Sequence, residues 1–377
     1  TLLALGWTVQ AALYRAATVL VAASPCAVVI SVPAAILSAL SAAARGGVLF
    51  KGGAALERLA VVRAYAFDKT GTLTTGRAEV TEVVALDGLA EALFVAQLAG
   101  IEAASEHHIA DAVLRYAKVL GVQPWGVSQV QAWPSEGISG TDAEGSVWAG
   151  NQRMVARMGA DASAHPALQP MQAGAQTVVH LGRGNRLLGA VTVADAPRAT
   201  AAAGIAALRA AGVGEIAMMT GDRREVALRI AADLGIHDAE VHADLLPADK
   251  VALVDALTAK GAVAFVGDGV NDAAALARAD VGIAMGAAGS EVALQAAEVA
   301  LLSDDMQRLA LAHALARRTA GIIRQNLIFA IGAMVVLVVA GLFFALPLPL
   351  AVIGHEGGTL LVVLNGLRLL NDPIRVR

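Results

Sequence analysis

Two stretches of this chain are almost continuously apolar and carry no charged side chain. No Asp, Glu, Lys or Arg occurs between Ala16 and Ala44, or between Leu327 and Gly354. As a helix, each stretch would be roughly 40 Å long, more than the roughly 30 Å of hydrocarbon in a bilayer. Buried helices of that length without one charge are unusual in soluble proteins. The pattern therefore predicts membrane-spanning helices near both ends of the sequence.

We expect three spanning segments. One lies within residues 1–50 and is centred on Cys26, and two lie within residues 318–372, from about Gly321 to Ala345 and from about Leu348 to Leu370. Basic residues follow the first span, precede the second and end the third: Arg45, Lys51, Arg58, Arg63, Arg317, Arg318, Arg324, Arg368, Arg375 and Arg377. The positive-inside rule places all these ends in the cytoplasm. The sequence thus predicts a multi-pass protein of the plasma (inner) membrane whose middle region is cytosolic.

Short apolar runs alternate with helical patterns in the middle region. Strands are predicted at Val61–Phe67, Ile216–Met219 and Val263–Val266, and helices at Arg223–Leu234, Asp249–Ala259 and Ala273–Ala279. Such alternation favours an α/β domain with a doubly wound parallel sheet, in which ligands bind beyond the carboxyl ends of the strands. Asp68, Asp222 and Asp268 follow such ends, so chemistry is expected there.

The pattern changes within residues 76–189. Two helices are predicted first, at Leu89–Gly100 and His108–Leu120. Short strands follow at Val127–Ala132, Ser146–Ala149, Thr177–Leu181 and Leu187–Val193. We interpret this segment as an α+β domain inserted into the parallel-sheet domain, which then comprises residues 51–75 and 190–310.

Composition and charge narrow the possible partners. Hydrophobic residues make up 57% of the chain and charged residues 16%, against about 45–50% and about 25% in soluble domains, so lipid is an expected partner. The net charge of −4 argues against nucleic-acid binding by bulk positive charge. The single cysteine excludes a disulfide framework and a Cys-rich structural zinc site.

The first strand is followed by Asp68-Lys69-Thr70-Gly71-Thr72-Leu73-Thr74, a specific signal in this strand-to-loop context. A carboxylate can attack a phosphoryl group only if cations offset the repulsion between two anions. Gly267-Asp268-Gly269-Val270-Asn271-Asp272 offers Asp268 and Asp272 as Mg²⁺ ligands, with Asn271 beside them. The sequence therefore predicts phosphoryl transfer to Asp68, with Lys69 and Thr70 in the same catalytic loop.

Two further motifs complete the predicted catalytic set. Thr220-Gly221-Asp222 can hold phosphoryl oxygens through its hydroxyl and backbone N–H groups, and Lys250 can neutralise the charge that develops during transfer. Taken alone, Thr220-Gly221-Asp222 could be an ordinary helix cap, and Lys250 could be a solvated surface residue. Their joint presence in this order favours the catalytic interpretation.

Polar residues within the apolar stretches predict an ion site. Pro25 of Ser24-Pro25-Cys26 cannot donate a backbone hydrogen bond, so it should open the helix and free a carbonyl beside the thiol. The structural alternative is a packing kink with an inert cysteine. His355-Glu356-Gly357-Gly358-Thr359 places ionisable groups in the last span, where they are costly and by default functional. The predicted ligands are Ser24, Cys26, His355, Glu356 and Thr359, and we expect the last three to face one side.

One sulfur, one imidazole and one carboxylate suit Zn²⁺, Co²⁺ or Fe²⁺, whereas Cu⁺ would require more thiolate or thioether ligands. Together, these motifs resemble the heavy-metal-transporting (type IB) P-type ATPases, and Ser-Pro-Cys with His-Glu-Gly-Gly-Thr resembles their cobalt/zinc branch. The resemblance covers about Ala16 to Asp372. It implies a haloacid-dehalogenase-like phosphorylation domain, ATP and Mg²⁺ as cofactors, and a transient aspartyl-phosphate at Asp68. Thr70 and Asp268 would help hold Mg²⁺.

The resemblance also implies roles outside the catalytic loop. Asp195 and Arg198 form an Asp-x-x-Arg element at the hinge between the two cytosolic domains. Residues resembling the family's nucleotide site are Glu102, Glu106, His107, Gly137, Gly140, Gly150 and Asn151. The sequence departs from the family pattern at His108, where proline is usual, and at Ser135-Glu136-Gly137, where Gly-x-Gly is expected.

The implied function is ATP-driven export of a divalent transition-metal ion. The family's Thr-Gly-Glu actuator loop does not occur in this sequence, so we expect the chain to accept phosphate but to turn over poorly without an N-terminal actuator portion. One alternative is a membrane-anchored phosphatase. Such enzymes usually carry a second Asp two residues after the nucleophile, where this chain has Thr70. A catalytically silent regulatory subunit is the other alternative.

Overall fold

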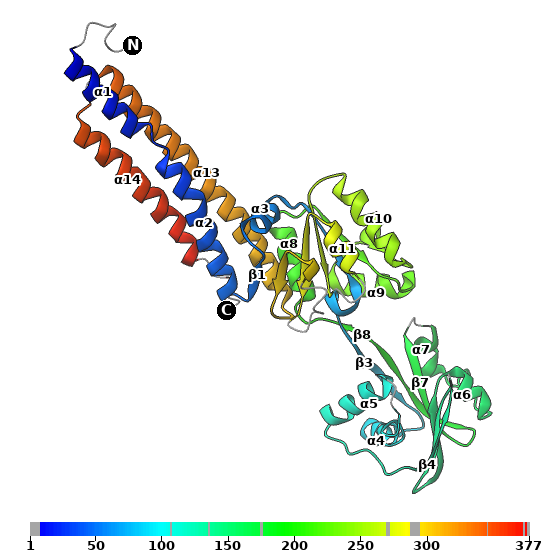
Figure 1. The fold of residues 1–377 in the computed structure, drawn as a ribbon. Helices are drawn as coiled ribbons and strands as arrows, with labels where there is room; N and C mark the ends of the chain where they lie inside the picture. The colour runs from blue at the N-terminus through cyan, green and yellow to red at the C-terminus, as the bar shows by residue number, and fades with distance from the viewer. Residues whose placement is uncertain are drawn as a thin grey trace. The chain divides into compact units, whose positions relative to one another are not determined.

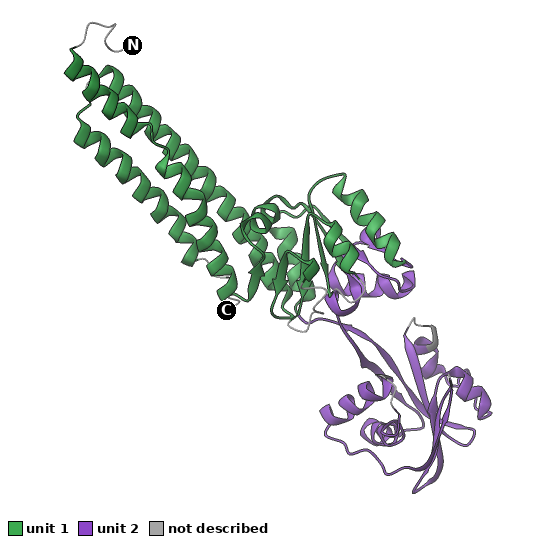
Figure 2. Ribbon diagram, viewed as in Figure 1, with its two compact units in different colours: residues 1–67, 200–217, 246–377 green, residues 68–199, 218–245 purple. Residues whose placement is uncertain are grey.

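The computed structural model describes residues 8–374 except 106–107, 135, 174–175, 269–271, 287–294, 345 and 372–373. The chain divides into two compact units, which Figure 2 shows in different colours. The first comprises residues 1–67, 200–217 and 246–377, and the second comprises residues 68–199 and 218–245.

The apolar stretches form long helices in the first unit. They are α1 (Val9–Ala22), α2 (Cys26–Arg45), α13 (Met306–Phe343) and α14 (Leu348–Leu367), and α13 packs against the other three (Figure 1). Within the part of the chain that the structure describes, three segments are long and apolar enough to cross a membrane: Val9–Arg45, Met306–Phe343 and Leu348–Asn371, the last ending in the turn η5 (Arg368–Asn371). Large apolar side chains such as Leu20 and Phe343 point outward, as expected of a surface that meets lipid.

The helix α13 begins earlier than the hydropathy pattern predicts. Asp305 caps it by accepting a hydrogen bond of 3.0 Å from the backbone N–H of Gln307. Its first turns are buried and contact α3 (Gly53–Val61) and α8 (Ala201–Ala210). These turns pack on protein and not on lipid, so they mix apolar and polar residues. A hydropathy pattern that marks membrane spans therefore does not include them. One continuous helix therefore joins the sheet domain to the apolar helices (Figure 1).

The predicted parallel sheet is present and has seven strands in the order β1-β13-β12-β11-β2-β9-β10. Their bounds are β1 Val48–Phe50, β2 Ala64–Asp68, β9 Glu215–Met219, β10 Val241–His242, β11 Val263–Gly267, β12 Val281–Met285 and β13 Val299–Leu301. Among the described residues, β10 pairs with β9, β11 with β12 and β2, and β12 with β13 in parallel, whereas the short edge strand β1 pairs antiparallel with β13. Strands of two or three residues such as β1, β10 and β13 are too short to show a hydrophobic period, which is why sequence analysis missed them.

The helices between these strands lie where the sequence predicts them. They are α9 (Arg224–Leu234), α10 (Pro247–Thr258) and α11 (Ala273–Arg278), with a short turn η4 at Asp238–Glu240. Gly235 ends α9 in the left-handed region at φ 69°, which glycine adopts without strain. Pro247 opens α10 at a position where a missing N–H costs nothing.

The inserted region forms a six-stranded antiparallel sheet in the order β3-β8-β7-β6-β5-β4. The strands are β3 Thr74–Ala85, β4 Ser128–Trp133, β5 Gly137–Asp142, β6 Gly145–Gly150, β7 Thr177–Arg183 and β8 Arg186–Pro197. Helices α4 (Glu91–Glu102) and α5 (His108–Val119) cover a core that includes Phe94, Leu98 and Leu181. A second core around Trp148 packs under α6 (Gln152–Arg157), η3 (Pro166–Leu168) and α7 (Gln169–Ala173).

Sequence analysis missed β3 and β5. Both are rich in polar residues and glycine, and β5 contains Ile138 as its one large apolar side chain. Their place in the sheet depends on backbone pairing with β8, β4 and β6 and not on a strong alternation of their own.

Candidate functional site

The predicted nucleophile lies at the carboxyl end of β2, an interior strand of the parallel sheet. Asp68 is 5% exposed, and the three residues before it are fully buried. In the register of the sheet Phe67 pairs with Val266 of β11; Asp68 is the last residue of β2, and Asp268 directly follows β11. Buried parallel strands thus present acidic groups where ligands of α/β sheets bind.

The loop after Asp68 is a single tight turn over Lys69–Leu73. Gly71 has φ 73°, which favours glycine, and the turn leads directly into β3. Thr70 is exposed at this turn, while Lys69 is only 4% exposed. The loop therefore buries a cation next to the predicted nucleophile and leaves the Thr70 hydroxyl accessible.

Lys69 is held between two carboxylates of the second unit. Its Nζ lies 2.8 Å from Oδ2 of Asp222 and 3.7 Å from Oδ2 of Asp195. Asp222 is positioned by its own motif, because its backbone N–H donates to Oγ1 of Thr220 at 3.1 Å. The Thr220 backbone pairs with His242 and Leu245. The predicted catalytic residues Lys69, Thr220, Gly221 and Asp222 therefore converge on one loop cluster.

The Asp-x-x-Arg element holds the same loop from the other side. Thr74 Oγ1 donates a short hydrogen bond to Asp195, and the Arg198 guanidinium donates to the backbone oxygens of Thr72 and Gly71 at 2.9 and 2.6 Å. The turn is thereby clamped by both Asp195 and Arg198.

Lys250 and Asp272 form a buried ion pair in the first unit. Lys250 Nζ donates to Asp272 Oδ1 at 2.8 Å, with Lys250 9% and Asp272 3% exposed. Asp249 caps the start of α10 by accepting from the backbone N–H of Leu246. Asp268 is half-buried, and the predicted residue Asn271 lies outside the described residues. The pair keeps an ammonium and a carboxylate at the sheet edge that carries Asp268.

The strand that ends in Asp68 is tied to the long helix α13. Tyr65 Oη and His313 Nδ1 are hydrogen-bonded at 3.1 Å, and their rings meet edge to face at 5.7 Å. Both side chains are buried, and burial raises the pKa of Tyr65, so the phenol stays neutral. Sequence analysis missed this contact, because nothing local marks either residue.

A large cavity of about 700 Å³ lies on the antiparallel sheet. Its lining includes four of the predicted nucleotide residues, Glu102, Gly137, Gly150 and Asn151. Gly137 pairs with Gly150, and a Cβ on either glycine would come within 2.4 Å of a backbone oxygen. The absence of side chains therefore allows these strands to approach each other beside the cavity.

The remaining predicted nucleotide residues are placed differently. Gly140 is not among the lining residues, and a Cβ there would meet the Val127 side chain at 2.6 Å, so its described role is packing. Glu106 and His107 lie outside the described residues. Trp133, which the sequence motifs do not include, also lines the cavity. The Arg157 guanidinium lies over its ring, 4.4 Å from the ring centroid.

The carboxyl group of Glu102 has a pKa that burial shifts from its ordinary value. It is 6% exposed, and burial raises its pKa to about 7. A carboxyl with a raised pKa in the folded state contributes stability below about pH 4.5, and this is lost as the pH rises through about 7. Between these values the wild-type unit should lose about 3 kcal/mol relative to Glu102→Gln.

The measurement is urea unfolding of the two proteins from pH 4.5 to 7.5, followed by tryptophan fluorescence. Three of the four tryptophans, Trp125, Trp133 and Trp148, belong to this sheet region. If the free energy of unfolding depended on pH equally in the two proteins, the pKa of Glu102 would not be raised.

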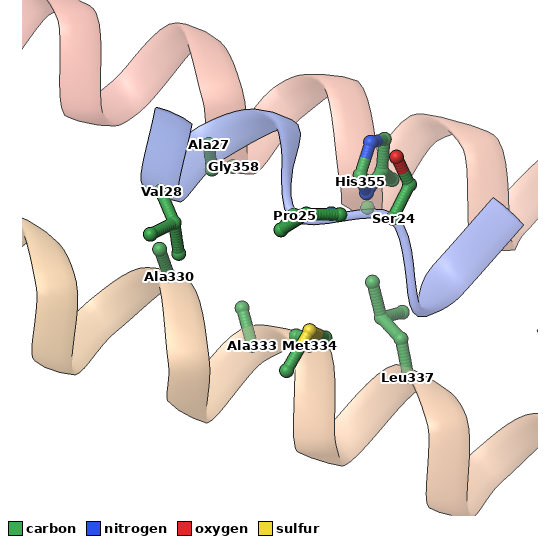
Figure 3. Close-up of a pocket in the computed structure, with 11 residues that line it drawn as sticks. Ser24, Pro25, Ala27, Val28, Ala330, Ala333, Met334, Leu337, His355 and Gly358 are labelled. Atoms are coloured by element: carbon green, nitrogen blue, oxygen red, sulfur yellow. The ribbon is translucent and has the colours of Figure 1, made fainter. Parts of the chain in front are cut away.

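The predicted ion site lies where the first apolar stretch is broken. Helix α1 ends at Ala22 and α2 begins at Cys26, as expected from Pro25, and Ser24 Oγ lies 3.1 Å from Cys26 Sγ. Ser24 and His355 line one small cavity together with α13 (Figure 3). Its volume of about 20 Å³ holds one water-sized occupant.

The structure does not place the five predicted ligands around this cavity together. Thr359 Oγ1 donates to the His355 backbone oxygen at 3.1 Å, while Glu356 is exposed on the helix surface. Successive helical residues differ by about 100° in direction, so a His355 that faces the cavity turns Glu356 away. The expectation that His355, Glu356 and Thr359 share one side is therefore corrected for Glu356. Within the described part of the chain, no three His, Cys, Asp or Glu side chains form a group that could hold a metal ion.

Comparison with known proteins identifies the sheet domain. Residues 62–280 match the model of the haloacid dehalogenase-like hydrolases, which covers more than half of the chain. The chain belongs to this hydrolase family. The match spans Asp68, Asp222, Lys250 and Asp268, and it confirms the predicted fold class.

Over nearly all its length the chain also resembles metal-transporting ATPases. It is 38% identical over 370 residues to a zinc-transporting ATPase of Bacillus subtilis (strain 168), covering 97% of this chain and 57% of that protein. It is 40% identical over 376 residues to a zinc/cadmium/lead-transporting P-type ATPase of Escherichia coli (strain K12), covering 98% and 49%. These matches confirm the resemblance to heavy-metal-transporting P-type ATPases.

The crystal structure of a zinc-transporting PIB-type ATPase in the E2.Pi state has a TM-score of 0.87 to this chain at 39% identity. The similarity covers 98% of this chain and 60% of that one. The chain thus spans about half to three fifths of the length of these three relatives.

Proposed function

We propose that this chain is part of an ATP-driven pump that exports a divalent transition-metal ion of the Zn²⁺, Co²⁺ or Fe²⁺ class. The observation that carries the proposal is that one chain holds both the clamped Asp68–Lys69 loop and, among helices able to span a membrane, a cavity lined by Ser24 and His355. The relatives named above transport zinc, cadmium or lead. The pump would lie in the plasma (inner) membrane with its catalytic region in the cytosol.

The chemistry is transfer of the terminal phosphoryl group of ATP to Asp68. A carboxylate oxygen forms the new bond to phosphorus, the bond to the bridging oxygen breaks, and ADP leaves. The Thr220 hydroxyl and the Gly221 backbone N–H would hold phosphoryl oxygens, and the Lys250 ammonium would offset the negative charge that moves to the leaving group. Each role uses a side chain or loop described above.

Magnesium fits the donor groups of this chain. Asp68, Asp268 and Asp272 are buried or half-buried carboxylates, and oxygen ligands are those Mg²⁺ prefers. Asp68, Thr70, Asp268 and Asp272 would hold the ion, which would neutralise phosphate charge. The exposed Thr70 hydroxyl stands where soluble phosphatases usually carry a general acid, which favours a long-lived phosphoenzyme.

The cavity on the antiparallel sheet is the proposed ATP site. Its volume of about 700 Å³ lies within the usual range for ligands of this size. Glu102 lines this cavity, and its carboxyl oxygen would accept a hydrogen bond from the exocyclic amine of adenine. Gly137, Gly150 and Asn151 would lie closer to the phosphates, with Glu106 and His107 completing the proposed set.

The experiment is labelling of the purified chain, in detergent, with γ-³²P-ATP and Mg²⁺. We expect an acid-stable, hydroxylamine-sensitive label that rises when Zn²⁺ or Co²⁺ is added. Cys26→Ala and His355→Ala should keep the basal label but lose the metal effect, because the ion site and the phosphorylation site are separate.

The two alternatives give other results. A membrane-anchored phosphatase would release phosphate rapidly from small phosphoesters without a metal-stimulated label. A regulatory subunit would bind ATP or nothing, and would form no label. A metal effect that survives in both Cys26→Ala and His355→Ala would remove the ion site from the proposal.

A further inference from the structure

The small cavity between the apolar helices contains a donor atom that the sequence motifs do not include. Met334 on α13 lines it together with Ser24 and His355 (Figure 3). The other lining groups are hydrocarbon or glycine, such as Pro25, Ala333 and Leu337. Three of the lining side chains therefore carry a donor atom: the hydroxyl oxygen of Ser24, an imidazole nitrogen of His355 and the thioether sulfur of Met334.

We propose that Met334 is a ligand of the transported ion and sets its selectivity towards softer cations. This inference rests on the proposed function, because it concerns the same ion site. Met334 is half-buried, in contrast to its neighbours Val335 and Val336, which are exposed and face outward from the helices. The direction of Met334 therefore places its side chain at the cavity and not at the lipid surface.

A second sulfur lies close by. Cys26 Sγ is within 3.1 Å of the Ser24 hydroxyl, which itself lines the cavity. The volume of about 20 Å³ admits one ion without its hydration shell. Cys26 does not itself line the cavity, so the lining side chains that could bind an ion there are Ser24, Met334 and His355, while the Glu356 carboxylate is exposed elsewhere on α14.

The donor set has a chemical consequence. Thioether and thiolate ligands favour soft cations, whereas carboxylate and water favour hard ones. Replacing a carboxylate by a thioether should improve the binding of Cd²⁺, which is softer, more than that of Co²⁺. The alternative for a methionine in an apolar region is that it only fills space, because its flexible chain fits irregular gaps.

The experiment compares Cd²⁺ and Co²⁺ binding to the whole chain in detergent micelles, by competition with a chelator. Met334→Leu keeps a side chain of similar volume and removes the sulfur. We expect it to weaken Cd²⁺ binding about tenfold and Co²⁺ binding less than about twofold. X-ray absorption of the Cd²⁺-loaded protein should show about one sulfur ligand fewer in the variant.

Two further variants separate the possible failures. Met306→Leu makes the same substitution at the buried start of α13 and should change neither affinity. His355→Ala should weaken both ions. If His355→Ala does so while Met334→Leu leaves the ratio of the two affinities and the sulfur count unchanged, Met334 is only a filler and this inference is overturned. If neither variant alters binding, the proposed ion site itself fails.

Discussion

Replacing Asp68 with asparagine should abolish acid-stable labelling of the chain by γ-³²P-ATP. An amide oxygen is a far weaker nucleophile than a carboxylate, so we expect the label to fall at least about 10³-fold, to background. Asp68 is 5% exposed at the end of β2, where an amide of the same shape can replace it without creating a cavity. The measurement is the ³²P radioactivity of acid-precipitated protein separated on acidic gels.

The control is Asp233→Asn, which makes the same change on the exposed surface of α9. It should label like the wild type. Binding of a fluorescent ATP analogue to Asp68→Asn should remain, since the cavity that carries Glu102 is formed by other elements. A hydroxylamine-sensitive label that persists in Asp68→Asn would assign the nucleophile to another carboxylate.

Replacing Lys250 with methionine should affect both stability and phosphorylation. The substitution leaves Asp272 buried at 3% exposure without its ammonium partner at 2.8 Å. Removing one partner of a buried pair typically costs about 3–5 kcal/mol. The rate of phosphoryl transfer should fall about 10²-fold or more, because a cation that offsets the transferred charge is lost. Chemical denaturation and quenched-flow labelling measure the two effects.

A double substitution separates the two roles of Lys250. Lys250→Met with Asp272→Asn removes the unpaired charge, so most of the lost stability should return while phosphorylation stays slow. Recovery of fast labelling in the double variant would mean that Lys250 acts only by neutralising Asp272. A double variant as unstable as Lys250→Met would instead assign the cost to packing of the lysine stem.

Local sequence patterns predicted where much of the candidate site lies. The nucleophile loop, Thr220-Gly221-Asp222 and Lys250 are each adjacent in sequence to a strand or a helix start, so hydrophobic runs and turn residues locate them. The helix break at Ser24-Pro25 was also expected, because proline removes a backbone donor wherever it stands in a helix. The polar strands β3 and β5 were missed, since only their neighbours in the sheet define them.

The sequence by itself located the apolar helices and the strand ends near Asp68, Asp222 and Asp268, because each depends on residues close together along the chain. The tertiary structure alone decided which side chains meet across elements. It joined Tyr65 to His313, turned Glu356 away from the cavity and brought Met334 to it. Such meetings depend on how helices rotate and pack against each other, and a helical period fixes the faces of a helix but not which neighbour each face meets.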